Sequence, residues 1–513
     1  MAVPPDLRGI IVARFDRLSS PARAALETGA VLGRRFERHV LRRTLAVVGV
    51  EDSPQAEEEV LCAGLWTADD ENVAFTHQFV WTAATDMALT STLRSLHAAA
   101  ATALEAVPDE GTGRYVGRLA VHHRAAGHPA ESAAYEARAS EQALLLGAYA
   151  DAERHAELGL GDLDVIAQSG ATPRADLELS LVLALGAGRM ITRGQSAPET
   201  YAAYERARRI TENLPPTRQS FQAVFGLRMA AAFRGDLRGA TVLGEQALSM
   251  AKEIGDEDLL LEATLMIGNM AFWHGRLDEA LEALRQVREA EVQGSHGEFV
   301  QQRRLTALFP LVLSQWLVTG DHALVQIADE GVEEARALGH RFSEAITLET
   351  SAFLAVLEQD RSRAQARGTE LLELAESESF PVYALMARVV LGWVGCGEDR
   401  PGDAADRVGR AVRALAAMRV ILGQTLMECF HADSALAAGD GMRALRATES
   451  GLRLAELTGE TVMTPMLHLL RARALEGGAR QHELEVGRSL AEQLGQHHVL
   501  SVIEAESLTG SAG

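Results

Sequence analysis

Apolar residues recur at helical spacing along most of the chain. In an early segment, Leu26, Ala30 and Val31 fall on one face of a helix. That helix follows Ser19-Ser20-Pro21, where a hydroxyl residue can cap the first turn and a proline can occupy the first helical position. The same periodicity predicts helices over residues 6–18, 57–64 and 79–107, and the chain should therefore be mainly helical.

The clearest strand signal lies in residues 65–77. Two short β-like runs flank the acidic turn Asp69-Asp70-Glu71, as in a β-hairpin. Helices followed by a small hairpin describe a winged-helix shape. We therefore expect a small winged-helix-like domain over residues 1–110.

Beyond Arg114 the sequence repeats itself. Between Gly235 and Gly478 the turn signals recur at a spacing near ~40 residues, which predicts a helix, a tight turn and a second helix in each repeat. One such helix pair cannot bury its apolar face alone, whereas stacked pairs form a superhelix with a concave and a convex side. Residues 111–513 should therefore form helical repeats, with a long loop or a slight break over residues 159–173. The turn signals begin at Gly147, Gly235, Gly275, Gly320, Asp360, Pro401, Gly439 and Gly478.

The composition agrees with an all-α fold. Ala, Leu, Glu and Arg dominate, all of them good helix formers, and aromatic residues make up only 5% of the chain. The longest apolar stretch, over residues 177–191, is too short to cross a bilayer, and no secretion signal is visible. Cys62, Cys396 and Cys429 lie far apart and form no paired motif. A cytoplasmic protein without a membrane partner is expected.

The net charge argues against nucleic acid as a partner. The formal charge is −22 and the pI is near 5.2, whereas nucleic-acid-binding proteins present basic surfaces. One arginine cluster, over residues 34–43, is expected to be a solvated helix face.

The repeats resemble tetratricopeptide repeats. Gly268 and Ala271 are small enough for paired helices to approach, Gly275 can form the turn, and Leu277 with Leu284 can fill the seam between the helices. The period is longer than the usual ~34 residues. It is similar to that of the extended repeats of bacterial signalling ATPases.

The first ~110 residues resemble the segment that joins the ATPase module to the repeats in STAND-type signalling ATPases. This class includes maltose-activator-like regulators and ATPase-linked adenylate cyclases. The resemblance is carried by the sequences VPPDLRGIIVARFDRLSSPARAALETGAVLGRRF and VAFTHQFVWTAATDMALTSTLRSLHAAAATALEAV. It implies a chain with the arm and the repeats but without the ATPase module.

No motif for independent catalysis accompanies this resemblance. A P-loop requires a lysine after its glycines, and Lys252, the one lysine in the sequence, follows Ala251 in a helical segment. Serine-hydrolase, zinc-peptidase and dinucleotide-binding motifs are also absent. We therefore expect a protein that is not an enzyme and holds no cofactor or metal of its own.

Several histidines are candidate ligands. The resemblance implies that His77, in the arm, approaches the phosphates of a nucleotide when an ATPase module is present. The alternative is a histidine that caps or hydrogen-bonds within the hairpin. His122-His123, His128 and His497-His498 are expected to be surface or turn residues, because adjacent histidines on a helix cannot share one metal ion.

The repeat register also implies a binding groove. In tetratricopeptide arrays the first helix of each pair lines the concave face, and aromatic and methionine side chains there suit a peptide or small effector. The alternative is that these residues fill the core between repeats. The register places on this face Phe225, Met229, Phe233, Glu262, Asn269, Phe272 and Trp273.

These observations favour a non-catalytic binding or sensor module of a signalling or transcription-regulating protein. Its partner would be a protein, a peptide or a small effector, and a separate ATPase module is a further partner implied by the resemblance. The alternative is a subunit or fragment of a nucleotide-dependent regulator or adenylate cyclase whose catalytic domain is missing or lies on another chain. A DNA-binding regulator is disfavoured by the charge.

Overall fold

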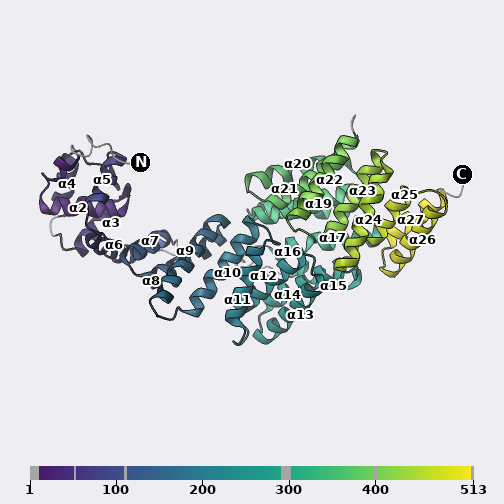
Figure 1. The fold of residues 1–513 in the computed structure, drawn as a ribbon, viewed down its shortest axis with the longest axis horizontal. Coiled ribbons are helices and arrows are strands. Elements are labelled where there is room, and N and C mark those ends of the chain that lie inside the picture. Colours follow the sequence, from purple (N-terminus) through teal and green to yellow (C-terminus); the bar gives the residue numbers. More distant parts are fainter. Residues whose placement is uncertain (1–10, 51–52, 109–112, 291–301, 398–400, 510–513) are drawn as a thin grey trace. The chain divides into compact units, whose positions relative to one another are not determined.

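The computed structural model describes residues 11–50, 53–108, 113–290, 302–397 and 401–509 (Figure 1). The chain divides into two compact units. Unit 1 comprises residues 1–142 and 154–181, and unit 2 comprises residues 143–153 and 182–513. This division by packing does not coincide with the change in sequence pattern near residue 110. The expected helix over residues 6–18 lies partly outside the described residues, and its residues 11–15 are helical.

Unit 1 begins with short helices around a small sheet and continues with longer helices. The expected break over residues 159–173 is mostly wrong, because α9 runs without interruption through Gly159 and Gly161. Only residues 169–174 separate α9 from the next helix. The helices are α2 (Ser20–Leu32), α3 (Arg38–Val47), α4 (Ser53–Cys62), α5 (Gln78–Met87), α6 (Thr90–Glu105), α7 (Val116–Ala126), α8 (Pro129–Leu145), α9 (Tyr149–Gln168) and α10 (Ala175–Thr192), the last three of which cross the division between the units.

The sheet of unit 1 confirms the predicted hairpin and adds a strand that the sequence did not indicate. Strands β2 (Trp66–Ala68) and β3 (Asn72–Phe75) pair antiparallel, with Trp66 opposite Phe75. Strand β1 (Arg35–Glu37) pairs with the other edge of β3. Phe36, Trp66 and Phe75 meet edge to face with ring centroids 5.5–6.3 Å apart, an arrangement that stabilises aromatic clusters.

The arginine cluster near these strands is largely exposed, as expected, but Arg34 and Arg35 do not lie on a helix and several of the arginines form ion pairs. Arg35 lies on a strand and pairs with Asp69 of the hairpin turn at 3.2 Å. Arg38 and Arg42 of α3 pair with Glu57 of α4, whose carboxylate is buried. These arginines therefore hold α3, α4 and the hairpin together.

Unit 2 consists of stacked antiparallel helix pairs, and the all-α helical-repeat fold is confirmed. Successive first helices begin at Arg218, Glu257, Leu308, Arg341, Pro381, Gln424 and Thr464. The pairs are α12 (Arg218–Phe233) with α13 (Leu237–Ile254), α14 (Glu257–Trp273) with α15 (Leu277–Glu289), α17 (Leu308–Thr319) with α18 (Leu324–Ala337), α19 (Arg341–Leu357) with α20 (Arg361–Ser377), α21 (Pro381–Gly395) with α22 (Pro401–Ala417), α23 (Gln424–Ala437) with α24 (Gly441–Thr458), and α25 (Thr464–Arg473) with α26 (Gly477–Gln493). Helix α11 (Pro198–Thr211) precedes them, α16 (Arg303–Thr306) is a short insertion, and α27 (His497–Thr509) follows.

The turns inside the pairs follow a simple chemical rule. Glycine adopts the left-handed conformation where the first helix ends, as at Gly235, Gly275 and Gly439. An aspartate then caps the second helix, as Asp236 does for α13 and Asp440 for α24. This combination explains the turns predicted at Gly235 and Gly439, each of which is followed by an aspartate.

The predicted small-residue contacts also hold. A Cβ atom on Gly268 would lie only 2.9 Å from Leu284 of the paired helix. Ala271, Leu277 and Leu284 are buried in the same seam. Close approach of the two helices therefore depends on the residues that carry the repeat resemblance.

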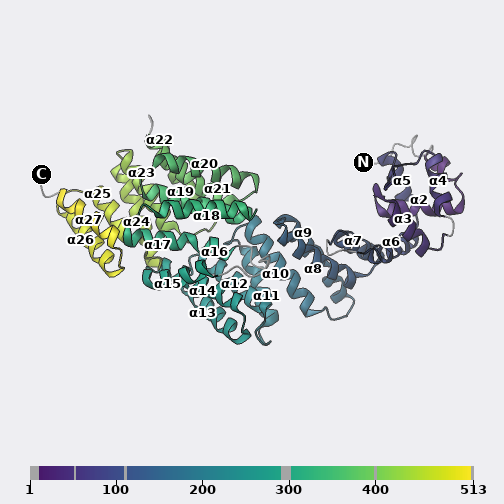
Figure 2. The same ribbon diagram turned by 180° about the vertical axis from the view of Figure 1, so that it is seen from behind.

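The pairs of unit 2 wind far enough for distant repeats to meet. The backbone N–H of Ile421 donates to the carbonyl of Phe233 at 2.7 Å, and the N–H of Thr461 donates to the carbonyl of Trp273 at 3.0 Å. One step further along, α17 packs against α27 (Figure 2). The end of α12 thus contacts the segment before α23, the end of α14 contacts the segment before α25, and α17 contacts α27.

The described helices include none that is long and apolar enough to cross a membrane.

Candidate functional site

A cavity lies inside the superhelical turn of unit 2. Its walls come mainly from the first helices α12, α14, α17, α19, α21 and α23, and the segment before α23 closes one side. The cavity volume is about 100 Å³, several times the ~10–15 Å³ needed to hold one water molecule. The lining residues are Gln195, Phe225, Arg228, Met229, Ala232, Phe233, Leu265, Met266, Asn269, Trp273, Thr306, Phe309, Pro310, Ile346, Glu349, Phe353, Val382, Tyr383, Met386, Leu422, Gly423, Leu426 and Met427.

The walls are mostly apolar and aromatic. The ring centroid of Phe309 lies 6.0 Å from that of Trp273 and 6.2 Å from that of Phe353. Met229, Met386 and other aliphatic side chains complete the surface. Apolar walls with a few fixed polar groups are typical of small-molecule and peptide sites.

Arg228 is a buried cation at this cavity. Its side chain is 5% exposed, and its Nε and Nη1 atoms have no hydrogen-bond partner among the described residues. The remaining nitrogen contacts the sulfur of Met229. Burial lowers the pKa of Arg228 to about 10, so the guanidinium stays charged at neutral pH. Buried donors without partners are costly in free energy, which makes this group unusual in a folded core.

Glu349 is a carboxyl group at the same cavity. It lies on α19 and is 8% exposed, and burial raises its pKa to about 8. No arginine among the described residues lowers this pKa. Glu349 is therefore uncharged at neutral pH and can both donate and accept a hydrogen bond. Its neighbour Tyr383 of α21 is also buried, and burial together with Glu349 raises the pKa of the Tyr383 phenol well above its usual value.

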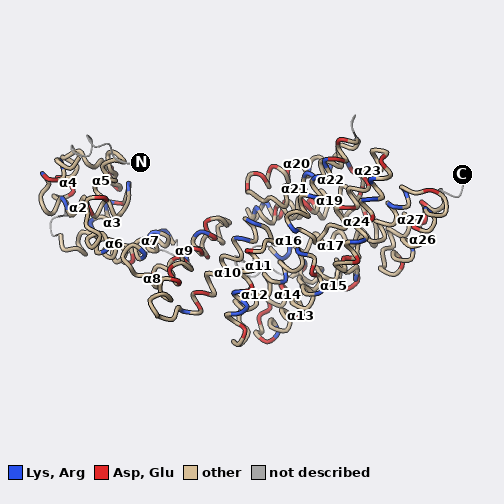
Figure 3. Tube along the Cα trace, in the orientation of Figure 1, with Lys and Arg blue, Asp and Glu red and all other residues tan. Residues whose placement is uncertain are grey.

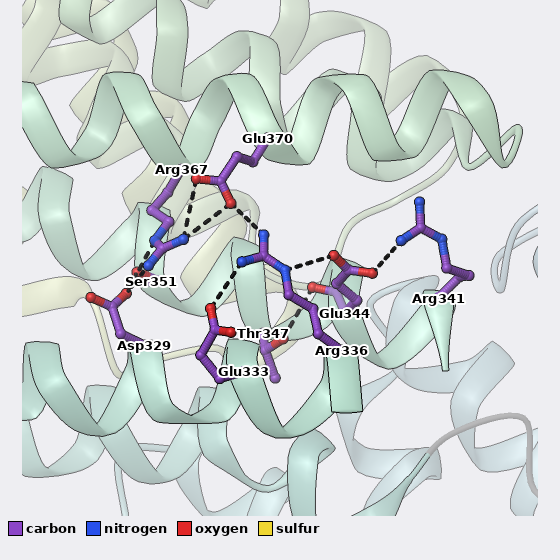
Figure 4. A network of polar contacts seen from close by, with 9 residues as sticks. All are labelled: Asp329, Glu333, Arg336, Arg341, Glu344, Thr347, Ser351, Arg367 and Glu370. Carbon is purple, nitrogen blue, oxygen red and sulfur yellow. Dashed lines mark hydrogen bonds and ion pairs between the residues drawn. The ribbon is translucent and has the colours of Figure 1, made fainter. Parts of the chain in front are cut away.

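An ion-pair network on the opposite face of α19 fixes the position of Glu349. Figure 4 shows Arg336 of α18 reaching Glu344 of α19 and Glu370 of α20. The Nε atom of Arg336 lies 3.1 Å from the carboxylate of Glu344. Asp329 of α18 also accepts a hydrogen bond from Ser351 of α19 at 2.8 Å.

Helical spacing relates this network to the cavity. Glu344 and Ser351 of the network are seven residues apart and share one face of α19. Two residues after Glu344 and Ser351 come Ile346 and Phe353, which therefore lie about 200° further around the helix. Glu349 lies between Ile346 and Phe353 at helical spacing and shares their face. The ion pairs and the hydrogen bond therefore hold one face of α19, while the opposite face, with Glu349, lines the cavity.

Further polar groups in the lining include Gln195, Asn269 and Trp273. The amide of Gln195 is buried, and that of Asn269 is half-buried. The indole Nε1 of Trp273 is buried without a hydrogen-bond partner among the described residues. The cavity thus offers a fixed cation, an uncharged acid and several directional groups within apolar walls.

The structure brings together five of the seven residues predicted for the groove. Phe225, Met229, Phe233, Asn269 and Trp273 line the cavity.

The other two predicted groove residues do not line it. Phe272 is fully buried and packs against Trp273 and Phe309, so for this side chain the core alternative holds. Glu262 is also buried, and a 3.8 Å ion pair joins it to Arg303. Burial raises the pKa of Glu262 to about 7.

The sequence contained a signal for part of what was missed. Phe225 and Leu265 each lie eight residues before the last residue of their helix, and Glu349 holds the same position in α19. Applying the repeat register to α19 as well would have predicted Glu349 as a residue of the binding surface. Arg228 gave no comparable signal, because an arginine in a helix is usually a surface residue.

His77 caps a helix. Its Nδ1 atom accepts a hydrogen bond from the backbone N–H of Phe79 at 3.3 Å, and its ring stacks on the Phe79 ring at 4.8 Å. The capping alternative describes this geometry, whereas the role of His77 toward a nucleotide stays a prediction.

The paired histidines of α7 are not surface residues, contrary to our expectation. His122 and His123 are both buried. The two Nδ1 atoms of His97 and His122 lie 2.9 Å apart, and burial lowers the pKa of His122 to about 3. His123 instead contacts Glu105 at 3.0 Å, so the adjacent rings do point to different partners.

No protein-family model matches the chain, and no curated protein matches it. Among solved structures, it is similar to a Rap protein in complex with competence and sporulation factor, with 14% identity over 75% of this chain and 98% of that one and a TM-score of 0.47. It is also similar to a STAND protein with a tetratricopeptide-repeat sensor from Pyrococcus horikoshii, with 11% identity over 98% of this chain and 68% of that one and a TM-score of 0.36. A third is the Rap conjugation regulator of plasmid pLS20 in complex with the Phr* peptide, with 12% identity over 86% and 99% and a TM-score of 0.42.

Proposed function

We propose that this chain is a non-catalytic binding module that takes up a peptide or small effector in the cavity of unit 2. The observation that carries the proposal is Arg228, a charged group in an apolar cavity with two donors that no described residue satisfies. A ligand that pairs with these donors would offset the cost of burying them.

The closure of the superhelical turn suggests how binding would be transmitted. The cavity walls belong both to α12 and α14 and to the segment that docks on their ends, including Leu422 and Gly423. A ligand that contacts both would favour the closed turn over any open one, since it binds only the state that contains both walls. This coupling is the physical basis of a sensor.

Surface charge agrees with a protein or small-molecule partner better than with nucleic acid. Figure 3 shows acidic and basic residues interspersed along the helices of both units, within the part of the chain that is described. The formal charge of −22 also opposes binding to phosphate backbones.

The test is a thermal-shift screen of short peptides and small metabolites on three proteins. Asn269→Trp fills the cavity, and Val242→Trp places the same side chain on the outer helix α13, where Val242 is 63% exposed. True ligands raise the Tm of the wild type and of Val242→Trp but not of Asn269→Trp. Ligands that shift all three proteins equally, or a screen without any ligand, would contradict the proposal.

A further inference from the structure

The charge inside the cavity restricts its ligand. Among the described residues that line it, Arg228 is the one cation and Glu349 is the one carboxyl. Burial holds Glu349 in its uncharged form at neutral pH by raising its pKa to about 8. The lining therefore carries one positive charge that no lining residue balances.

No neighbouring acid satisfies Arg228 either. The acid whose charge acts on Arg228 is Glu262, which lies outside the lining. Glu262 is shared with Arg303, which also pairs with Asp258 at 2.6 Å. Two donors of Arg228 remain without an acceptor among the described residues. A charged guanidinium with unsatisfied N–H donors favours an anionic oxygen acceptor, and a carboxylate is such an acceptor.

The size and the walls restrict the rest of the ligand. At about 100 Å³, the cavity is smaller than the ~150 Å³ apolar cavity that takes up benzene in a protein core. Phe225, Phe353 and Met386 provide apolar and sulfur contacts for a short branched hydrocarbon group. Polar groups of a ligand that lie against the apolar walls would remain unpaired.

From these contacts we infer that the cavity of unit 2 recognises a carboxylate at the end of a short apolar group, with the carboxylate paired to Arg228. Glu349 and the indole N–H of Trp273 then serve as hydrogen-bonding groups for the remaining lone pairs. The inference rests on the proposed function and adds the chemical class of the ligand. Such a carboxylate can belong to a free short-chain acid or to the C-terminus of a peptide that ends in an aliphatic residue.

The experiment is isothermal titration calorimetry with the full chain at pH 7. The probes are isovalerate and its uncharged amide, isovaleramide, followed by acetyl-glycyl-leucine as the free acid and as the C-terminal amide. We expect at least one acid to bind, with its amide at least about tenfold weaker. If isovalerate binds, the source is a free acid, and if only the peptide acid binds, the source is a peptide end. Neither acid binding, or amides binding as tightly as acids, would overturn the inference.

Variants locate the binding. Arg228→Met keeps the length of the side chain without its charge, and Arg238→Met makes the same change at an exposed position on α13. The acid should bind Arg238→Met as it binds the wild type, and Arg228→Met at least about tenfold more weakly. Unchanged binding to Arg228→Met would overturn the inference. If Arg228→Met does not fold, the comparison of acid and amide binding to the wild type still tests the inference.

The two proposals fail in different ways. If the screen finds ligands that Asn269→Trp excludes but no carboxylate binds, the inference on ligand class is wrong and the binding function stands. If the screen finds no ligand of the cavity at all, both are wrong.

Discussion

The backbone N–H of Thr461 donates a 3.0 Å hydrogen bond to the carbonyl of Trp273, a residue 188 positions earlier in the chain. Ile421 and Phe233 repeat this relationship with the same separation. Trp273 and Phe233 both line the cavity, so the bonds that close the superhelical turn are made by residues of the binding surface. A change that opens the superhelical turn should therefore also alter the cavity.

The closure can be tested at Gly235, which lies two residues after Phe233. Its φ is +85°, and an added Cβ atom would lie 2.7 Å from Ile421. Gly255 has a similar φ of +75° but nothing within 4 Å of the corresponding position. We expect Gly255→Ala to cost about 1 kcal/mol of unfolding free energy through backbone strain alone.

Gly235→Ala should cost about 1–3 kcal/mol more than Gly255→Ala, because overpacking at the closure adds to the same strain. Urea denaturation of the two variants and the wild type measures both values. Equal losses would show that the contact of Gly235 with the later repeat contributes little to stability.

Glu349 should make stability depend on pH. Its carboxyl has a pKa of about 8 when folded, compared with an ordinary value of 4.5. A raised pKa means that the folded state keeps a proton that the unfolded state has released, so stability is full below about pH 4.5 and falls until about pH 8. Tyr383 is the titratable neighbour on the adjoining α21, and it stays protonated throughout this range.

Glu349→Gln cannot titrate and should remove this part of the pH dependence. The variant should become more stable relative to the wild type as the pH rises from 5 to 9, by an amount on the order of a few kcal/mol. Denaturation curves at several pH values measure the difference, which cancels contributions from the other buried acids, Glu262 and Glu460. The exposed substitution Glu373→Gln is the control. A constant difference between wild type and Glu349→Gln across this range would show that Glu349 titrates normally.

The repeat architecture was predictable because its determinants are local. Gly235 and Asp236 specify a turn through their own backbone and side-chain preferences. The position of Gly268 within the repeat predicts that it lies where the paired helices approach each other. The same locality explains why five groove residues were placed at the cavity. Each lies on a first helix at a position that the register fixes.

What the sequence did not reveal depends on contacts between distant segments. Ile421 meets Phe233 only after the intervening repeats have accumulated their rotation, and no local pattern encodes that angle. The cavity that Arg228 and Glu349 line also includes residues from both sides of this closure, such as Phe233 and Leu422. Strand β1 was missed for a similar reason, because Arg35 has no strand signal until β3 pairs with it.

The network in Figure 4 should contribute more than ordinary surface ion pairs. Arg336 bridges α18, α19 and α20 through Glu333, Glu344 and Glu370, and Glu344 is only 8% exposed in its side chain. Arg336→Ala leaves this buried carboxylate with one fewer partner. Because Arg336 is itself 36% exposed, solvent screening limits the expected loss to about 1–2 kcal/mol.

Arg453→Ala is a suitable control for Arg336→Ala. Arg453 forms a single exposed pair with Glu449 on one helix, for which a loss below about 0.5 kcal/mol is expected. Urea denaturation at low and high salt compares the two variants. If Arg336→Ala costs no more than Arg453→Ala, the network does not hold α19 in place.

The prediction that the chain has no nucleotide site of its own can be tested by calorimetric titration with ATP and ADP, with and without magnesium. We expect no binding tighter than about 1 mM, or about −4 kcal/mol. Lys252, the one lysine, lies within α13 and not in a phosphate-binding loop. Tighter binding would support the alternative of a nucleotide-dependent regulator, and His77 would be the first residue to examine. His77→Asn keeps a capping side chain, so loss of binding in a variant of unchanged Tm would assign the nucleotide contact to the imidazole and not to the cap.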